Sequence, residues 1–316
     1  MNRKIILAGA QLGPVQRSDS RRHVVERLIS LVEDAAEKGA RWVVFPELSL
    51  TTFFPRYWLD DDAEIDRFFE TEMPSPTTSA LFKRARELEV GFYLGYAELV
   101  QEAGHKRRFN TAILVDPMGR QIGKYRKVHL PGHLDYLPTA PFQHLEKRYF
   151  DVGDLGFPVW NTVDAKIGMC ICNDRRWPET FRVMGLQGVE IVMLGYNTPS
   201  YNIYHEEQPH LRMFHNRLSV QAAAYQNACW IIAVAKAGCE DGHALIGGSC
   251  IVAPTGEIAA QAMTEKDELI VFEADLELSS YIRNTVFDFA RHRRPEHYGL
   301  IVERRGAGAL LGKLES

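Results

Sequence analysis

The chain has 316 residues, of which 46% are hydrophobic and 25% are charged, and this balance is typical of a globular protein rather than a disordered one. Its formal net charge of -4 comes from 37 basic and 41 acidic residues mixed along the chain, so we expect no nucleic-acid or membrane partner and favour a small-molecule ligand. No apolar stretch approaches the roughly 20 residues needed to span a bilayer. The 5 scattered cysteines, with no secretion signal, predict reduced thiols in the cytoplasm.

Apolar runs and helical spacing alternate along the chain and predict an α/β protein. The near-continuous apolar run at 41–45 is typical of a strand whose sheet is covered on both faces. In order, we expect strand 5–12, helix 20–38, strand 41–45, helix 77–89, strand 92–99, a hairpin within 110–127, strand 165–172, helix 178–186, strand 190–195, helix 214–227, strand 229–235 and a hairpin within 249–262.

The two predicted hairpins resemble each other. "DPMGRQI" in the first is echoed by "APTGEI" in the second, and this weak internal similarity suggests two related halves. Two sheets stacked face to face, each with helices on its outer side, would bury the apolar strands on both faces. No linker divides the chain, so we expect a single domain with a four-layer α-β-β-α architecture.

The stretch "MCICNDRRWPE" (169–179) places Cys172 at the end of an apolar strand, shortly before a helix that starts at Pro178. Helix amides and the neighbouring arginines would favour the thiolate of a nucleophile there. A buried structural cysteine is the alternative, and it is the commoner fate of an isolated cysteine. Cys170 raises the idea of a metal site, but no second cysteine pair or closely spaced histidine pair completes one, so we expect no metal.

Two further charged residues end or follow strands. Glu47 comes after the apolar strand 41–45, where burial would raise its pKa toward that of a general base, although an ordinary loop acid is the alternative. Lys127 in "GKYRKVHLPGH" could stabilise an oxyanion or simply be a solvated member of a basic cluster. The residues alone leave these alternatives open.

A resemblance decides between them. The segments "FPELSLTTFFP", "GKYRKVHLPGH", "FQHLEKRYF", "GDLGFPV", "CNDRRWPE" and "GYNTP" resemble, in that order, the carbon–nitrogen hydrolase (nitrilase) superfamily, and within it N-carbamoyl-D-amino acid amidohydrolases. The likeness runs from about Lys4 to Glu303, which predicts a hydrolase domain at 1–303 and a tail at 304–316. It implies a homo-oligomer, dimer or tetramer, and no cofactor.

The resemblance also implies roles for individual residues. Cys172 becomes the nucleophile, Glu47 the general base and later acid, Lys127 the oxyanion stabiliser and Glu146 a second glutamate near this triad. It also implies that six further residues bind the substrate carboxylate or the carbamoyl group, namely Asn173, Arg175, Arg176, Asn197, Thr198 and His144. Two adjacent arginines suit a carboxylate, because guanidinium groups can bind it in a forked geometry.

His129 and His215 are expected to support the site, and structural histidines are the alternative for both. The chain departs from close relatives at Cys170 and in the loop 200–210, which leaves the preferred substrate side chain open. The implied reaction releases a D-amino acid, ammonia and carbon dioxide through a cysteine thioester. The rivals are hydrolysis of N-carbamoyl-β-alanine or an aliphatic amide, and a catalytically silent scaffold of the same fold.

Overall fold

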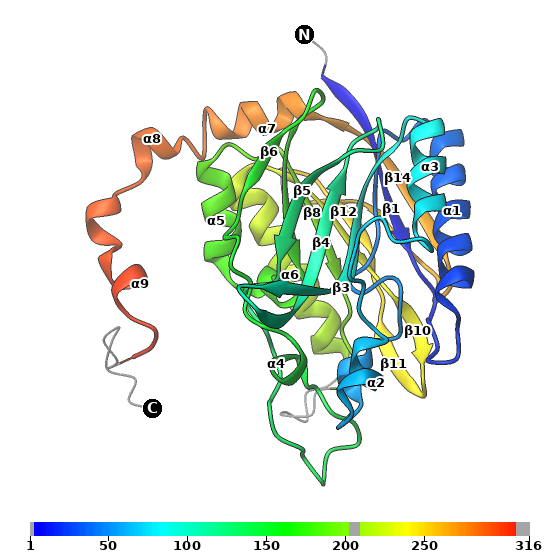
Figure 1. Cartoon of the computed structure of the whole chain (residues 1–316). Coiled ribbons are helices and arrows are strands. Elements are labelled where there is room, and N and C mark those ends of the chain that lie inside the picture. Colours follow the sequence, from blue (N-terminus) through cyan, green and yellow to red (C-terminus); the bar gives the residue numbers. More distant parts are fainter. Residues whose placement is uncertain (1–2, 202–208, 308–316) are drawn as a thin grey trace.

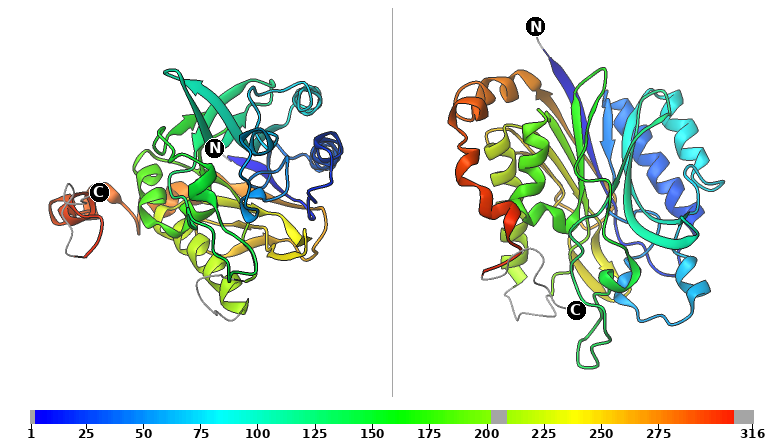
Figure 2. Two further views of the ribbon diagram at one scale, coloured as in Figure 1. Left: turned by 60° about the horizontal axis from the view of Figure 1, so that its bottom comes forward. Right: turned by 60° about the vertical axis from the view of Figure 1, so that its left-hand side comes forward.

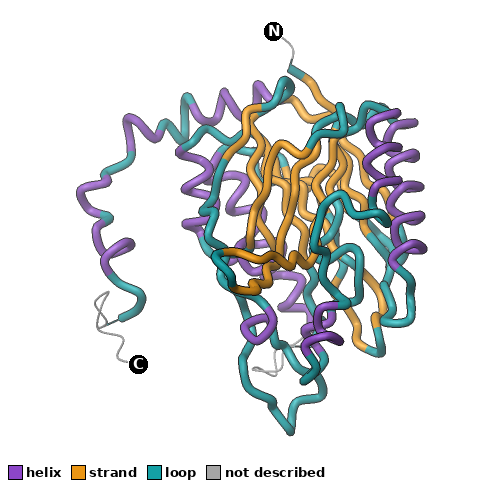
Figure 3. The backbone as a smooth tube through the Cα atoms, in the orientation of Figure 1, coloured by secondary structure: helices purple, strands orange, loops and turns teal. Residues whose placement is uncertain are grey.

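The apolar runs form the central strands of two six-stranded sheets in the structure, a computed structural model that describes residues 3–201 and 209–307 (Figures 1 and 3). Across the first sheet the strands are β14 (Glu268–Asp275), β1 (Lys4–Gln11), β2 (Trp42–Val44), β3 (Gly91–Glu102), β4 (His105–Val115) and β5 (Gln121–Arg126). Across the second they are β13 (Ile258–Gln261), β12 (Cys250–Val252), β9 (Trp230–Ala235), β8 (Ile191–Tyr196), β7 (Lys166–Ile171) and β6 (Val159–Asn161). A separate hairpin pairs β10 (Ala237–Glu240) with β11 (His243–Ile246).

The two sheets share one topology. In the first, β1, β2 and β3 are parallel neighbours, and the antiparallel strands β4 and β5 follow. In the second, β7, β8 and β9 are parallel neighbours, and the antiparallel strands β12 and β13 follow. The two similar hairpins of the sequence therefore occupy equivalent places, which confirms the prediction of two related halves.

Helices cover the outer face of each sheet, and the two sheets face each other in the middle (Figure 2). The outer helices are α1 (Arg21–Glu37) and α3 (Ser79–Glu87) on the first sheet, and α5 (Pro178–Leu186) and α6 (Pro209–Asn227) on the second. The short helices are α2 (Asp62–Asp66), α4 (Glu146–Tyr149), α7 (Leu276–Arg283), α8 (Phe289–His292) and α9 (Gly299–Glu303). This arrangement confirms the four-layer α-β-β-α sandwich.

Strand alternation explains why apolar residues on successive positions are all buried. Trp42 and Val44 of β2 belong to the core between the sheets, whereas Val43 and Phe45 pack beneath α1 and α3. Successive side chains of a strand point to opposite faces, so a strand covered on both sides needs an unbroken apolar run.

Several elements differ from the sequence prediction. β14 was not expected, and it pairs antiparallel with β1 across more than 250 positions of the chain. β3 extends to Glu102 and forms a long hairpin with β4, where charged residues hide the strand pattern. α6 begins at Pro209 rather than near 214, since proline is well suited to a first helical turn.

After α7 the chain leaves the sandwich as an arm, residues 284–307, which carries α8 and α9; its first part contacts α5 and α6 through Phe289 and Phe287, and its end lies further from the body (Figures 1 and 2). Neither α8 nor α9 contains a buried residue. Most of the predicted tail 304–316, like most of the loop 200–210, lies outside the described residues.

Candidate active site

Four of the predicted site residues follow strands of the two sheets. Glu47 comes after β2, Lys127 after β5, Cys172 directly after β7 and Asn197 directly after β8. In parallel sheets the residues at the carboxyl ends of strands gather at one edge, which is where α/β proteins commonly bind ligands. The fold thus brings together residues that are up to 150 positions apart in the sequence.

The centre of the site is a buried cluster of two carboxylates and one ammonium, Glu47, Lys127 and Glu146, which we call the catalytic cluster. Lys127 Nζ donates to Glu47 Oε1 at 2.7 Å and to Glu146 Oε2 at 2.5 Å, and all three side chains are 0% exposed. Asn110 Nδ2 also donates to Glu47 Oε1, at 2.8 Å. Buried charges are tolerated when they are paired and hydrogen-bonded, as they are here.

Asn197 connects the thiol to the Glu47 carboxylate. Its backbone N–H donates to Glu47 Oε2 at 2.9 Å, and its side-chain amide donates to the Glu47 carbonyl at 2.8 Å. Its carbonyl in turn accepts a hydrogen bond from Cys172 Sγ at 3.3 Å. The thiol, which is only 6% exposed, is therefore held beside the carboxylate that is the predicted base.

Two residues of the site have left-handed backbone conformations that are unfavourable for their side chains. Cys172 has φ 47° and begins a 3₁₀ turn, Cys172–Arg176, while Leu48, next to Glu47, has φ 45°. Such strain persists only where the surroundings impose it, and it occurs often at functional sites. It turns Cys172 out of the regular strand that ends at Ile171.

Two glycines, one from each sheet, hold the backbone at Glu47. A Cβ atom at Gly95 would lie 2.6 Å from the Pro46 carbonyl oxygen, and one at Gly195 would lie 2.6 Å from the Glu47 nitrogen. Any larger residue would push the Pro46–Glu47 segment away. The glycines of "FYLGYAEL" and "MLGYNTP" are thus explained by the close approach of the general-base loop.

Burial and neighbouring charges set the proton affinities of the catalytic cluster. Burial raises the pKa of Glu47, and Glu146 adds to this, while Lys127 opposes it. Burial also disfavours ionised Glu146, but Lys127 and His144 outweigh it and lower its pKa. Burial lowers the pKa of Lys127, but Cys172, Glu146 and Glu47 outweigh burial and raise it, so this residue stays an ammonium. The expected rise in the pKa of Glu47 is confirmed.

The thiol differs from the prediction. Burial raises the pKa of Cys172, the Glu47 carboxylate adds to this rise, and Lys127 and Arg175 only partly offset it. A thiolate favoured by helix amides and arginines was expected, and the net direction is the opposite, because the group is almost completely buried. The raised pKa favours the neutral thiol, which would need a base to act as a nucleophile, and the Glu47 carboxylate lies next to it.

The adjacent arginines lie in different environments. Arg175 is 2% exposed; its guanidinium donates to the Cys172 carbonyl at 2.6 Å and to Thr198 Oγ1 at 2.8 Å, and it lies over the Tyr196 ring. Arg176 is exposed and donates to Asn173 Oδ1 at 3.2 Å. Arg175 thus holds the turn that begins at Cys172, while Arg176 stands exposed on the same turn; binding of a substrate carboxylate by the two arginines stays a prediction.

Asn173 and His129 form the wall beside the nucleophile. Asn173 Nδ2 donates to the His129 carbonyl at 3.1 Å, and the His129 ring is 2.8 Å from Asp174 Oδ1. The same ring stacks on Trp177 at a centroid distance of 4.9 Å. His129 therefore contacts the turn that begins at Cys172, and its supporting role stays a prediction.

The two remaining histidines fall in different places. His144 Nε2 lies 3.3 Å from Glu146 Oε1, and its ring packs edge-on against Phe53, so it borders the catalytic cluster. His215 is exposed on α6, and its described ring contact is with Phe214. No described contact brings His215 to the cluster, so its expected supporting role is not seen.

Two polar residues of the site were not predicted from the sequence. Asn110 reaches Glu47, and Asp174 accepts hydrogen bonds from the backbone N–H of Ile171 and His129 and from the Tyr125 hydroxyl. Asp174 is 0% exposed. The available signal for Asn110 was a polar residue in the mostly apolar second half of β4, whereas Asp174 stands among charged neighbours that gave no separate signal.

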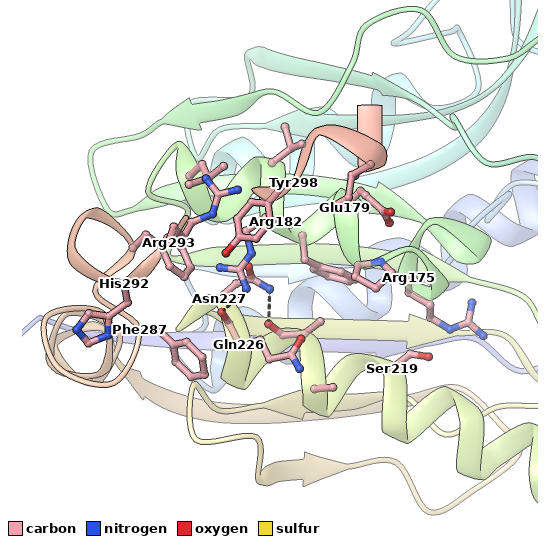
Figure 4. A pocket seen from close by; sticks show the side chains of 18 of the residues that line it. Arg175, Glu179, Arg182, Ser219, Gln226, Asn227, Phe287, His292, Arg293 and Tyr298 are labelled. Atoms are coloured by element: carbon pink, nitrogen blue, oxygen red, sulfur yellow. Dashed lines mark hydrogen bonds between the residues drawn. The ribbon is translucent and has the colours of Figure 1, made fainter. Parts of the chain in front are cut away.

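A cavity of about 640 Å³ lies elsewhere, between α5, α6 and the arm (Figure 4). Arg175 stands at one side of this cavity, and Arg293 and Tyr298 of the arm face it from the other (Figure 4). Glu47, Lys127 and Cys172 do not line it. The cavity is thus separate from the catalytic cluster.

Three general findings complete the description. All five cysteines are free, and only Cys239 is exposed. Within the described ranges, no group of three or more His, Cys, Asp or Glu side chains is arranged to hold a metal ion. In the same ranges, every helix is too short or too polar to cross a membrane.

A buried thiol beside a paired carboxylate and ammonium defines a cysteine-dependent hydrolase site. Residues 6–284 match the carbon-nitrogen hydrolase family, and the chain belongs to this family. It is 32% identical over 287 residues to N-carbamoylputrescine amidase of Arabidopsis thaliana, covering 87% of this chain and 89% of that one. It is 28% identical over 309 residues to citrullinase of Francisella tularensis subsp. tularensis, covering 94% and 100%.

The fold agrees with this assignment. The crystal structure of a carbon-nitrogen hydrolase from Helicobacter pylori G27 superposes with a TM-score of 0.81 and 25% identity, covering 96% of this chain and 99% of that one. The protein is therefore a cysteine-dependent amidohydrolase with the nitrilase-like sandwich fold.

Proposed function

We propose that the protein hydrolyses N-carbamoyl-D-amino acids to the D-amino acid, ammonia and carbon dioxide. The observation that carries this proposal is the buried Glu47–Lys127–Glu146 cluster beside the Cys172 thiol. The names of the relatives N-carbamoylputrescine amidase and citrullinase support a ureido group as the reacting part. The choice of an amino acid with D configuration comes from the sequence resemblance.

In the first half of the reaction, Glu47 takes the thiol proton while Cys172 Sγ attacks the ureido carbonyl carbon. The carbonyl oxygen becomes an oxyanion, which the Lys127 ammonium stabilises. Glu47 then gives its proton to the departing nitrogen, and the C–N bond breaks to leave a thioester on Cys172. Because Glu47 has a raised pKa, it can act in both directions at moderate pH.

In the second half, water attacks the thioester carbonyl while Glu47 accepts a proton from the water. The C–S bond breaks, the thiol is restored, and the carbamate released in this way decomposes to carbon dioxide and an amine or ammonia. Either C–N bond of the ureido group can break first in this scheme. The thioester divides one difficult hydrolysis into two easier steps.

An exposed arginine near the thiol suits an anionic substrate. Arg176 is exposed on the turn that carries Cys172, and His144 borders Glu146. The nearest buried carboxylates, Glu47 and Glu146, are already paired with Lys127. A carbamoylated diamine would bring a cation toward Arg176, whereas a carbamoyl amino acid brings a carboxylate that Arg176 can bind.

Two other substrates keep the same chemistry. N-carbamoyl-β-alanine would retain the carboxylate one carbon further away, and an aliphatic amide would lack it. A silent scaffold is disfavoured, because the buried charges of the catalytic cluster are costly to keep and the thiol is intact beside them.

The test is a panel of N-carbamoyl amino acids scored by ammonia release from purified protein. It compares D and L forms of N-carbamoyl-phenylalanine and N-carbamoyl-alanine with N-carbamoyl-β-alanine, N-carbamoylputrescine and propionamide. We expect the highest kcat/KM for D forms. Preference for N-carbamoylputrescine or the L forms would overturn the proposed substrate and leave the hydrolase assignment intact.

Assembly into a dimer or tetramer stays a prediction from the sequence. The exposed apolar side chains of the arm, such as Leu300, Ile301 and Val302, and those of α5 and α6, such as Leu186 and Leu218, favour a second copy as their partner. Light scattering coupled to gel filtration would measure the mass in solution, and a monomer at micromolar concentration would contradict it.

A further inference from the structure

A second cluster of buried charged side chains lies next to the catalytic cluster, on the other side of Asn197. Lys236 Nζ is 2.7 Å from Glu240 Oε2, Arg56 is 2.6 Å from Glu240 Oε1, and these side chains are 0%, 0% and 3% exposed. Lys236 follows β9, Glu240 ends β10, and Arg56 ends the loop that starts at Glu47. We call these three residues the rear cluster.

The rear cluster fixes the loop that carries the general base. Lys236 Nζ donates to the Thr51 carbonyl at 2.8 Å, and Glu240 Oε1 accepts from the Phe53 N–H at 2.8 Å. Arg56 Nε donates to the Phe53 carbonyl at 3.0 Å. The loop after the strained Leu48 is therefore held at three points.

The rear cluster also reaches Glu47 through Asn197. The Lys236 backbone N–H donates to Asn197 Oδ1 at 3.3 Å. Nδ2 of the Asn197 side chain donates to the Glu47 carbonyl at 2.8 Å. A single buried amide thus joins Lys236 to the segment that holds the general base. Burial lowers the pKa of Lys236, and Glu240 and, to a smaller extent, Glu47 oppose this lowering, so Lys236 interacts electrostatically with the Glu47 carboxylate.

The two clusters carry opposite excess charges. The catalytic cluster has two carboxylates and one ammonium, so it carries one extra negative charge when both acids are ionised. The rear cluster has two cations and one carboxylate, so it carries one extra positive charge. In a buried setting, such charges interact strongly over several ångströms.

We infer that Lys236, Glu240 and Arg56 form a positioning cluster that holds the Glu47 loop and electrostatically favours the ionised form of Glu47, which must accept the Cys172 proton. This inference rests on the proposed function only in assigning Glu47 as the base. Lys236 and Glu240 act through Asn197 and the loop, and they do not touch the substrate.

The test measures how fast iodoacetamide alkylates Cys172 as a function of pH, followed by mass spectrometry of the Cys172 peptide. All variants carry Cys239→Ser, because Cys239 is the exposed cysteine. Lys236→Met removes a positive charge, Glu240→Gln removes a negative charge, and Lys236→Arg keeps the charge. Lys4→Met, which breaks an exposed pair with Glu273, is the surface control.

Lys236→Met should move the midpoint of the alkylation profile up by about one pH unit, because ionised Glu47 loses a stabilising charge. Glu240→Gln should move it down, and Lys236→Arg and Lys4→Met should leave it close to the parent. The groups that face Glu47 are Lys127, Glu146, Cys172 and Tyr93, with His144 behind Glu146, and Asp241 and His243 act on Arg56. All of them stay in every variant, so the difference in midpoint isolates the substituted charge.

Shifts in the same direction for Lys236→Met and Glu240→Gln, or unchanged midpoints, would overturn the inference and leave a purely structural role. If Glu240→Gln does not fold, the comparison of Lys236→Met with Lys236→Arg decides. Because alkylation needs no substrate, this result is independent of the substrate panel. If the substrate panel shows no preference for the D forms but the alkylation midpoints of Lys236→Met and Glu240→Gln shift in opposite directions, only the proposed substrate is rejected.

Discussion

Glu47 and Glu240 are both completely buried glutamates paired with a buried lysine, yet their carboxylates accept different numbers of hydrogen bonds. Glu240 accepts from four donors in the described structure: Lys236, Arg56 and the backbone N–H groups of Val15 and Phe53. Glu47 accepts from three, namely Lys127, Asn110 and the Asn197 N–H. A carboxylate has about four lone-pair sites. Glu240 is saturated, whereas Glu47 keeps the capacity to accept a proton from the thiol.

The two glutamates also differ in how their backbone is packed. Glu47 is followed by Leu48 in a strained conformation and is enclosed by Gly95 and Gly195. Glu240 ends a hairpin strand paired with His243 and is followed by the two-residue turn Asp241–Gly242, where both residues have positive φ, a conformation that Asp and Gly adopt readily in such turns. Glu47 is thus the unsaturated carboxylate, on a backbone held by close glycine contacts, and Glu240 is the saturated one, beside an ordinary hairpin turn.

Removing the nucleophile is the largest expected effect, because only the Glu47 site contains a thiol. Cys172→Ala should lower ammonia release from N-carbamoyl-D-phenylalanine by about 10⁴-fold or more with an unchanged circular dichroism spectrum. Cys239→Ser, at the exposed cysteine, is the control and should retain activity. Unchanged turnover in Cys172→Ala would refute the mechanism.

Substitution of the two buried lysines should separate the effect on turnover from the effect on the free energy of unfolding. Lys127→Met and Lys236→Met each leave a buried carboxylate without its ammonium, which costs about 3–5 kcal/mol of unfolding free energy. Only Lys127→Met should abolish turnover, since only Lys127 reaches the oxyanion. Chemical denaturation and ammonia release measure the two effects.

A compensating change sharpens this comparison. Lys127→Met combined with Glu146→Gln removes the charge that lost its partner, so it should recover part of the stability but no activity. Recovery of turnover in the double variant would show that Lys127 is a structural counter-ion and not an oxyanion stabiliser.

Crowding Glu47 should reduce activity without removing any chemical group. In Gly195→Ala the new methyl group would lie 2.6 Å from the Glu47 nitrogen, so the base must move. A misplacement of about 1 Å costs up to about 100-fold, and we expect kcat to fall by about 10–100-fold. Gly306→Ala, where the added Cβ meets nothing within 4 Å, is the matched control and should have no effect.

Arg176→Ala should have an effect no larger than that of Gly195→Ala, and the effect should depend on the substrate. We expect kcat/KM for N-carbamoyl-D-phenylalanine to fall by about 10–100-fold, because a charge-assisted contact with the carboxylate is lost. Propionamide, which has no carboxylate, should be hydrolysed at a nearly unchanged rate. An equal loss on both substrates would argue against carboxylate recognition.

Much of the fold was predictable from the sequence, because strands buried on both faces give unbroken apolar runs. The runs at 41–45 and 229–235 were recognised for this reason. β14 was missed, since its sequence ELIVFEAD mixes charged and apolar residues and its partner β1 lies at the other end of the chain. Pairing over such distances leaves no local signal.

The site was predictable to the extent that its residues sit in recognisable segments. The Glu47, Lys127 and Cys172 segments carry the family resemblance, and the structure places all three together. Lys236, Glu240 and Arg56 could not be found, because the contacts that connect them to the loop after Glu47 cross 184 or more positions, although Lys236 and Glu240 are only four positions apart. The difference between Arg175 and Arg176 also needed the geometry of the turn.

The central claim is that Cys172, activated by Glu47, forms a covalent thioester with the substrate. The most direct test quenches the wild-type enzyme in acid during turnover of N-carbamoyl-D-phenylalanine, digests it and measures the mass of the peptide that contains Cys172. We predict a carbamoyl or N-carboxy-amino-acid adduct on Cys172, which also shows which C–N bond breaks first. An active enzyme with an unmodified Cys172 peptide, or with the adduct on another residue, would contradict the account.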